Sequence, residues 1–462
     1  MACDSAGARQ VTFELQQHPF ICGLAQLNRA DVAAACLQLS AAHSAELDAF
    51  QRIPAGDEQL QRFAQLVLNA APQAVFPPSV LNSWLKSGQH LPDWARLRAI
   101  AEALDASTGA EGLLFPHDPG THRLVPGEVI QRGSPPYDRL WSGTQRLSTR
   151  PQSLGASRWY RRVAGGRIQV PSGPQRLRSL VVVPAGADFV LHQSRFSVFD
   201  PDAHLRIAFG LPNHDLDAAL TFDTHTDDDG TWFENVRPRD MADQRRRLRQ
   251  LVDSAKVLPT VGGRMPDVLV LPELCTTPDL AAETLDASQP IPLVLAGSHH
   301  HDQRNSAPFR LGRSLRGLHH KRNRFEHRSF GHERIIVETG LHLVRSGGWL
   351  VCPLICKDLL DLNTLQLLGA VGCNLVLVAA LSDRTDPFES SAELIGTHLQ
   401  GITAIANAAL QPDAAVPALL GLPLREHGLR LNTPPDHRRD GLWIVDVGLD
   451  YSVPEWSFEP LV

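Results

Sequence analysis

LVCPLICKDLLD, residues 350–361, gives the strongest indication of the fold that we expect for this chain. Its first half is an apolar run of Leu, Val and Ile punctuated by one Pro, which is typical of a short buried strand. Cys356 stands at the end of that run. A lone cysteine in this position is usually an inert core residue, so a chemical role requires reactive partners elsewhere in the chain.

Two further stretches supply such partners. DVLVLPE, residues 267–273, is a second apolar run and ends at Glu273, and HHK, residues 319–321, ends at Lys321 in a loop that leads out of a predicted hairpin. A carboxylate, an ammonium and a thiol delivered in this way can converge at one edge of a sheet. Together they provide a base, a charge stabiliser and a nucleophile for attack on a carbonyl or nitrile carbon.

Lysine is rare in this chain, which draws attention to Lys321. Of 44 Lys and Arg residues only four are lysine, and two of these, Lys321 and Lys357, lie in the three stretches. An ammonium is a compact point donor that a guanidinium cannot replace in a tight site. We therefore expect Lys321 to act in the site, and we expect the Lys357 side chain to face solvent.

These stretches resemble the motifs of the nitrilase superfamily of carbon–nitrogen hydrolases. The matching pieces are VLVLPELCTT around Glu273, GLHHKRNRF around Lys321 and LVCPLICKDLLD around Cys356, with weaker matches in LRIAFGLPNHD, GCNLVLVAALS and ITAIANAAL. The resemblance covers roughly residues 202–453. It implies an α/β fold, an α-β-β-α sandwich of the nitrilase type, and a homodimer or a larger homo-oligomer.

The resemblance also implies a mechanism. Glu273 takes the proton of the Cys356 thiol, the thiolate attacks an amide or nitrile carbon, and Lys321 with the backbone N–H of Lys357 holds the developing negative charge. A cysteine thioester forms and is hydrolysed by water. This chemistry needs no metal and no cofactor. The predicted function is therefore hydrolysis of a non-peptide carbon–nitrogen bond, most simply that of a small amide.

Supporting residues follow from the same resemblance. A second glutamate often supports the lysine in this family, and Glu333 is our first choice, with Glu326 and Glu338 as alternatives. Asp358, the second residue after the cysteine, is a supporting residue and favours amidase-like members. The sequence departs from the family pattern at Lys357, where an aromatic or small residue is common, and after residue 410. A catalytically degenerate binding or assembly module is the alternative function.

Composition limits the other functions. The formal net charge is −6, with 43% hydrophobic and 20% charged residues, and the seven cysteines show no paired spacing. These values favour a cytoplasmic protein with reduced thiols and without a general attraction to nucleic acid or membrane. The N-terminus has no signal-peptide pattern, and no apolar stretch reaches the length of a membrane span. Abundant Arg with scarce Lys suggests a bacterial source.

The first part of the chain reads as a separate helical domain, residues 1–118. Residues 25–47, 58–70 and 94–104 carry apolar side chains at helical spacing. Residues 79–107 resemble the back half of a repressor-type helix-turn-helix. The expected front half is not evident, and this region lacks the excess of basic residues that is typical of a DNA reader, so we favour a protein-interaction or packing role.

Residues 119–201 form an Arg-rich linker or a small β-containing segment before a hydrolase domain at 202–462. Eleven arginines and several aromatic residues occur between 120 and 179. This mixture suits base stacking and phosphate pairing, but it equally suits a segment wrapped against an acidic face, and we favour the latter.

Two histidine groups invite a metal hypothesis. His299, His300 and His301 are consecutive, and His319 and His320 precede Lys321. Adjacent histidines in a strand point to opposite faces and rarely bind one ion, so no metal is predicted.

Overall fold

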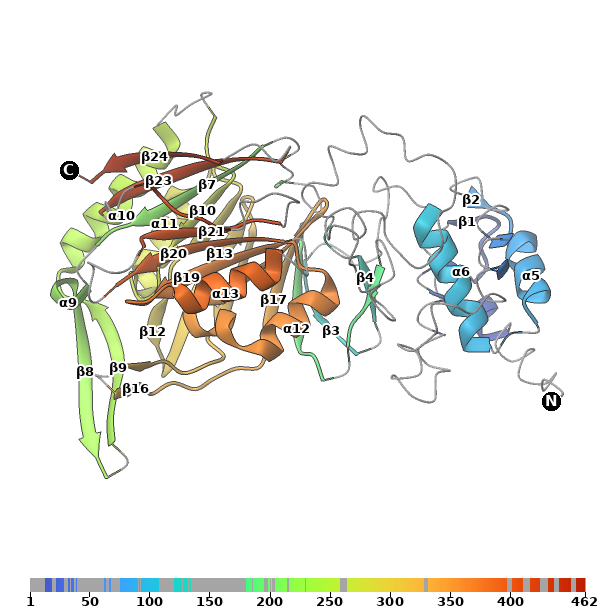
Figure 1. Ribbon diagram of the computed structural model, residues 1–462, viewed down its shortest axis with the longest axis horizontal. Coiled ribbons are helices and arrows are strands. Elements are labelled where there is room, and N and C mark those ends of the chain that lie inside the picture. Colours follow the sequence, from blue (N-terminus) through green and yellow to red (C-terminus); the bar gives the residue numbers. More distant parts are fainter. Residues whose placement is uncertain are drawn as a thin grey trace.

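The computed structural model describes parts of residues 13–39, 62–107, 120–133 and 180–461, each range with short gaps. Two eight-stranded sheets lie face to face, and helices cover the outer face of each (Figure 1). The fold is therefore an α-β-β-α sandwich, as the resemblance to the nitrilase superfamily implies.

The first sheet has the order β12-β13-β11-β10-β7-β23-β24, with β14 paired to β13. Strands β7, β10 and β11 are parallel, and the others are antiparallel to their neighbours. The strands are β7 His204–Leu211, β10 Val268–Leu271, β11 Leu293–Ala296, β12 His299–His301, β13 Arg304–Leu311, β14 Leu315–His320, β23 Gly441–Gly448 and β24 Glu455–Pro460. The strand predicted in the DVLVLPE stretch is confirmed as β10.

The second sheet has the order β22-β21-β20-β19-β18-β17-β6-β3. Its central strands β18, β19 and β20 are parallel and completely buried. The strands are β3 Gly120–Leu124, β6 Phe189–Gln193, β17 Leu341–Ser346, β18 Trp349–Ile355, β19 Leu375–Leu381, β20 Ile402–Ala408, β21 Ala418–Gly421 and β22 Leu431–Asn432. The strand predicted before Cys356 is confirmed as β18.

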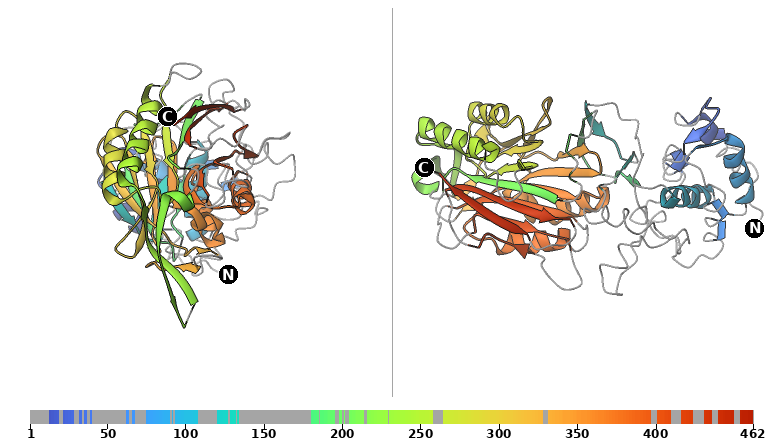
Figure 2. Two further views of the ribbon diagram at one scale, coloured as in Figure 1. Left: turned by 90° about the vertical axis from the view of Figure 1, so that its left-hand side faces the viewer. Right: turned by 90° about the horizontal axis from the view of Figure 1, so that it is seen from above.

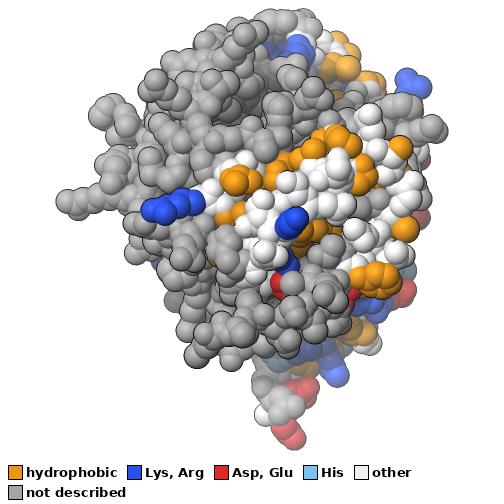
Figure 3. Space-filling view, turned by 90° about the vertical axis from the view of Figure 1, so that its right-hand side faces the viewer, with side chains coloured by type: hydrophobic (Ala, Val, Ile, Leu, Met, Phe, Trp, Pro, Cys, Tyr) orange, Lys and Arg blue, Asp and Glu red, His pale blue; other side chains and the backbone are white. Residues whose placement is uncertain are grey.

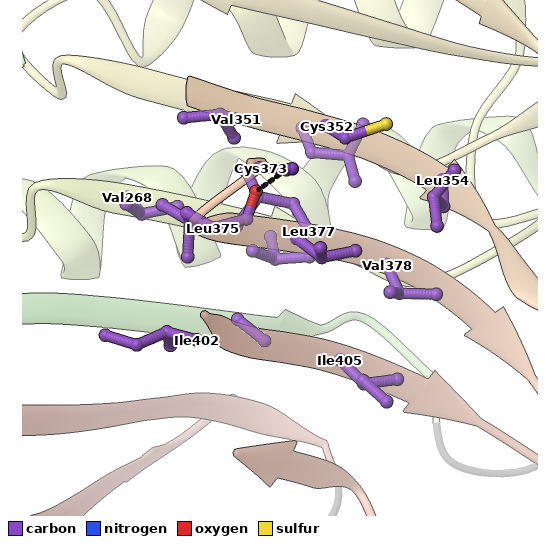
Figure 4. Close-up of a cluster of buried hydrophobic side chains, with 14 of the residues drawn as sticks. Val268, Val351, Cys352, Leu354, Cys373, Leu375, Leu377, Val378, Ile402 and Ile405 are labelled. Atoms are coloured by element: carbon purple, nitrogen blue, oxygen red, sulfur yellow. Dashed lines mark hydrogen bonds between the residues drawn. The ribbon is translucent and has the colours of Figure 1, made fainter. Parts of the chain in front are cut away.

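Successive side chains of β10 point to opposite faces of the sheet, so this one apolar run contributes to two cores. Val268 and Val270 point into the core between the sheets, whereas Leu269 and Leu271 join the core beneath the outer helices. Side chains two residues apart share a face of a strand, so a strand buried on both faces must be apolar at every position. Figure 4 shows Val268 among the side chains of β18, β19 and β20 in the central core.

Four helices form the outer layers. Helices α10 (Met241–Val257) and α11 (Pro278–Ala287) cover the first sheet, and α12 (Leu362–Val371) and α13 (Asp386–Leu394) cover the second (Figure 2). The Thr277 side chain caps α11 by accepting the N–H of Leu280, and Asp361 caps α12 in the same way. These side chains satisfy backbone donors that a helix start leaves without an intrahelical partner.

A long hairpin extends from one end of the sandwich (Figure 1). It follows the short helix α9 (Leu216–Ala219) and consists of β8 (Leu220–Asp227) and β9 (Gly230–Pro238). Two short strands, β15 (Glu326–His327) and β16 (Gly331–Glu333), extend it to a four-stranded sheet of order β15-β16-β9-β8. Because β9 pairs with β16, the hairpin lies next to the segment that contains Glu333.

The second sheet extends across the domain boundary predicted at residue 202. Strands β3 and β6 both precede residue 202, and β6 pairs in parallel with β17. A further pair, β4 (Val129–Gln131) and β5 (Leu180–Val182), lies in the same part of the chain. The described residues of the segment 119–201 are thus rich in β-structure, while 134–179 lie outside the described residues. Local sequence does not disclose this pairing because the strands are short and their partners are distant.

The described N-terminal residues form a small apolar core of their own. Helices α5 (Pro78–Ser87) and α6 (Asp93–Ser107) cover the stretch that resembles a helix-turn-helix, which stays a prediction. The helix expected to begin near residue 25 is wrong at Leu27–Asn28, which is strand β1 paired with β2 (Val75–Phe76). Where this end of the molecule is described, Figure 3 shows single Lys and Arg side chains among uncharged ones. No helix among the described residues has the length and apolar character needed to cross a membrane.

Candidate active site

The three predicted reactive residues meet at one end of the sandwich because each follows a strand. Glu273 comes two residues after β10, Lys321 follows β14, and Cys356 follows β18 and begins the 3-10 helix η2 (Cys356–Leu360). Cys356 has a φ of 45°, which is uncommon for a residue other than glycine. Such strained backbone is concentrated at functional sites, where the surrounding structure enforces it.

Lys321 lies between two carboxylates. Its Nζ donates to Glu273 Oε1 at 2.6 Å and to Glu333 Oε2 at 2.7 Å. All three side chains are at most 3% exposed. Of the three glutamates proposed to support Lys321, the structure therefore brings Glu333 to it. Glu326 is exposed on β15, and Glu338 accepts from Arg304 Nε at 2.9 Å.

Asn305 joins the two glutamates and was missed in the sequence. Its Nδ2 donates to Glu273 Oε1 at 2.8 Å and to Glu333 Oε1 at 2.9 Å, and the side chain is fully buried. The backbone of Asn305 also accepts the N–H of Lys321 at 2.8 Å. Asn305 precedes the lysine by sixteen positions on the neighbouring strand of a hairpin, and no local motif marks it.

His300 is a second residue whose role in the site was not foreseen. Its Nδ1 accepts the N–H of Val236 at 3.2 Å, so Nδ1 carries no proton in this arrangement. Nε2 is then the protonated nitrogen and donates to Glu333 Oε1 at 2.8 Å. Glu333 also accepts the backbone N–H of Phe325 at 3.0 Å. The carboxylate of Glu333 is thus surrounded by donors, which favour its ionised form.

The pKa values of the two glutamates are shifted in opposite directions. Burial raises the pKa of Glu273, and the nearby Glu333 charge adds to this, although Lys321 opposes it. Burial also acts to raise the pKa of Glu333, but Lys321 and His300 outweigh it and hold that pKa well below its ordinary value. Glu273 is therefore the carboxylate better suited to accept a proton, and Glu333 the one that remains charged beside Lys321.

The ammonium and the thiol also have displaced pKa values. Burial acts to lower the pKa of Lys321, but the two carboxylates outweigh it, so the pKa lies above its ordinary value and the ammonium stays charged. Burial raises the pKa of Cys356, and the Glu273 carboxylate raises it further. Cys356 is thus a thiol rather than a thiolate, and such a thiol reacts as a nucleophile only when a base takes its proton. Its Sγ lies 3.5 Å from the carbonyl oxygen of Leu381.

Asp358 links the loop that contains Lys321 to the turn that begins at Cys356 through hydrogen bonds. Its Oδ1 accepts the backbone N–H groups of Arg322 and Asn323, both at 2.9 Å, and the Asn323 amide at 3.2 Å. Its Oδ2 lies 3.2 Å from His319 Nε2 and 3.4 Å from the backbone N of Ile355. A single buried carboxylate thereby connects residues on either side of Lys321 with the residue before Cys356.

Replacing Asp358 by Asn is expected to destabilise the protein by about 2 kcal/mol, because one acceptor oxygen is lost and buried N–H donors are left without a partner. The Cys356 thiol should also become less reactive as the two loops separate. Urea unfolding and the rate of Cys356 alkylation measure these effects. The matched control is Asp361→Asn at the start of α12, where Asn caps a helix as well as Asp does. Equal stability of the two variants would contradict the role given to Asp358.

Lys357 and the histidines, which are the remaining residues singled out in the sequence, lie in different surroundings. The Lys357 side chain is exposed, and only its backbone N–H belongs to the proposed charge-binding set. His299 is buried and His301 is exposed, whereas His300 and His319 contact Glu333 and Asp358. Among the residues that the structure describes, no group of three or more His, Cys, Asp or Glu side chains is arranged to hold a metal ion.

A comparison with solved structures found several that are similar to this chain at low sequence identity. An amidase from Nesterenkonia sp. is 15% identical, with 55% of this chain and 94% of that chain covered and a TM-score of 0.35. Saccharomyces cerevisiae Nit3, a member of branch 10 of the nitrilase superfamily, is 12% identical over 54% of this chain and 91% of that one, with a TM-score of 0.39.

A third similar structure is a glutamine-dependent NAD+ synthetase from Acinetobacter baumannii, 13% identical, with a TM-score of 0.37. The alignment covers 53% of this chain and 45% of that larger protein. No family model matches this sequence, and no curated protein matches it.

Proposed function

We propose that this chain hydrolyses a non-peptide carbon–nitrogen bond, that of a small amide, through a thioester on Cys356. The observation that carries the proposal is the buried Lys321 ammonium held between Glu273 and Glu333. Burying three charges is costly unless they are well paired, and a purely apolar packing of the same space would be at least as stable. Their position beside a cysteine with strained backbone supports a chemical role.

The proposed reaction begins with proton transfer from the Cys356 thiol to Glu273. The sulfur attacks the amide carbon, and the developing negative charge on oxygen is held by the Lys321 ammonium and the backbone N–H of Lys357. Glu273 returns the proton to the departing nitrogen, and ammonia or an amine leaves. Water then gives a proton to Glu273 and attacks the thioester, and Glu273 returns that proton to the departing sulfur, which releases the acid and the free thiol.

Glu333, Asn305 and Asp358 position the reacting groups in this scheme. Glu333 keeps the lysine charged and fixed in place, and Asn305 orients the Glu273 carboxylate through Oε1. Asp358 sets the distance between the lysine loop and the cysteine turn. The homo-oligomeric assembly, the cytoplasmic location and the bacterial source stay predictions.

Ammonia release from a panel of small amides and nitriles tests the proposal, with intact-protein mass spectrometry to detect the acyl adduct. Native chain should release ammonia from amides and carry a transient acyl group on Cys356. Cys356→Ala should lose both signals, because no other residue in the scheme can form the thioester. The matched control is Cys352→Ala, which removes a buried thiol from the middle of β18. Ammonia release that persists in Cys356→Ala would overturn the proposal.

A further inference from the structure

Three histidines lie where the two sheets face each other, and the proposed reaction does not use them. His319 is on β14 of the first sheet, and His342 and His192 are on β17 and β6 of the second. The ring centroids of His319 and His342 lie 5.8 Å apart, edge to face, so the group crosses the space between the sheets. His319 is completely buried, and His192 is nearly so. Polar rings in such a place need hydrogen-bond partners.

His192 and His342 form a hydrogen-bonded pair on one side of the group. His192 Nε2 lies 2.8 Å from His342 Nδ1, and Thr121 Oγ1 on β3 lies 3.1 Å from His192 Nδ1. Phe309 of β13 packs edge to face against both rings, with centroid distances of 5.0 and 5.9 Å. Burial lowers the pKa of His192 to about 4 and that of His342 to about 3, so both rings are neutral at neutral pH. The pair is thus a fixed, uncharged wall against which the third ring packs.

His319 contacts that wall on one side and Asp358 on the other. Its Nε2 lies 3.2 Å from Asp358 Oδ2, and because a carboxylate oxygen accepts, Nε2 is the donor. Its Nδ1 is buried and has no hydrogen-bond partner in the part of the chain that the structure describes. A leucine in this position would avoid the unpaired nitrogen, so the Nε2–H donor is what histidine adds to apolar packing.

This donor matters because Asp358 holds two segments at once. Its Oδ1 accepts two backbone N–H groups directly after Lys321, and its Oδ2 faces the turn that begins at Cys356. The bond from His319 to Oδ2 fixes the rotation of the carboxylate plane, so each oxygen stays with its own segment. Resting on the proposed function, we propose that His319 is a positioning residue that sets, through Asp358, the distance between Lys321 and Cys356.

Replacing His319 by Leu and by Gln separates the hydrogen bond from the packing. The Nε2 of glutamine can donate where the imidazole Nε2 does, whereas leucine only fills the space. The rate of Cys356 alkylation by iodoacetamide, divided by that of the exposed Cys22, measures the effect. In His319→Leu the ratio should fall by roughly 10–100-fold, because the reacting groups lose their common support. In His319→Gln it should stay close to the native value.

The matched control is His320→Leu, the same change at the next residue of β14. The His320 Nδ1 lies 2.8 Å from Ser306 Oγ and not beside Asp358, so alkylation of the active-site thiol should stay near the native rate. Equal ratios in His319→Leu and His319→Gln, or in His319→Leu and His320→Leu, would overturn the positioning role.

Nuclear magnetic resonance of native chain with ¹⁵N-labelled histidine tests the same bond without a change in packing, and it serves if His319→Leu does not fold. The His319 ring, identified by the signal that is missing in His319→Gln, should carry its proton on Nε2. A proton on Nδ1 instead would overturn the proposal. Native chain that releases no ammonia from amides, while alkylation of Cys356 still depends on a donor at residue 319, would overturn the hydrolysis and leave the positioning role in place.

Discussion

Replacing Glu273 by Gln is expected to slow alkylation of Cys356 by roughly 10²–10⁴-fold at neutral pH, the usual contribution of a positioned base. Burial and the neighbouring carboxylate raise the pKa of Cys356, so the sulfur reacts only if a base takes its proton. Glutamine keeps the size of Glu273 and can still accept from Lys321 and Asn305, but it cannot take up the proton. Iodoacetamide labelling across pH, read cysteine by cysteine by peptide mass spectrometry, measures the effect.

Two other thiols, Cys352 on β18 and Cys373 in the turn before β19, are the internal control for this experiment. Cys352 and Cys373 are fully buried, and burial raises the pKa of both. Their labelling should be slow and independent of Glu273. Labelling of Cys356 at the same slow rate, and unchanged in Glu273→Gln, would show that the cysteine is an ordinary core thiol and would favour the binding-module alternative.

Replacing Lys321 by Met is expected to destabilise the protein by about 3–5 kcal/mol at neutral pH. The ammonium is buried between Glu273 and Glu333, so its removal leaves two carboxylates in a site without a counter-charge. The matched control is Lys256→Met. Lys256 Nζ lies 2.8 Å from Asp253, whose side chain is 67% exposed, and a pair open to solvent contributes only about 0–1 kcal/mol. Urea unfolding of the two variants measures the difference.

The loss caused by Lys321→Met should depend on pH in a defined direction. Without the ammonium, burial raises the folded-state pKa of both glutamates above the unfolded value of about 4.3. A raised carboxyl pKa costs stability as pH rises, so the variant should lose stability between about pH 4 and 7. In native chain the pKa of Glu333 is lowered, and its contribution is present at neutral pH and lost as the pH falls. The difference between the two proteins should therefore shrink in acid, and a constant difference would contradict this account.

Glu273 and Cys356 could be predicted because each follows a strand that is apolar at every position. Val268 to Leu271 and Leu350 to Ile355 are buried on both faces, and that requirement is written in consecutive residues. A residue with a reactive side chain at the end of such a strand is then conspicuous, because it follows a run of apolar residues. Lys321 was marked in another way, by the scarcity of lysine in a chain rich in arginine.

Asn305 and His300 could not be predicted because their importance depends on pairing across strands. Asn305 reaches the lysine loop through the register of β13 with β14, and His300 reaches Glu333 through contact with β9. The choice of Glu333 over Glu326 and Glu338 has the same origin, since Glu333 lies on a strand that pairs with the hairpin.

From the sequence alone we could predict the layered α/β fold of the second half, the strands that precede Glu273 and Cys356, and the three side chains that we propose to react. Local periodicity and residue type contain that information, because burial constrains neighbouring positions directly. The extension of the second sheet by β3 and β6 and the bridging of two glutamates by Asn305 became apparent only in the three-dimensional structure. These features depend on contacts between residues far apart in the chain, whose geometry is fixed by sheet register and packing.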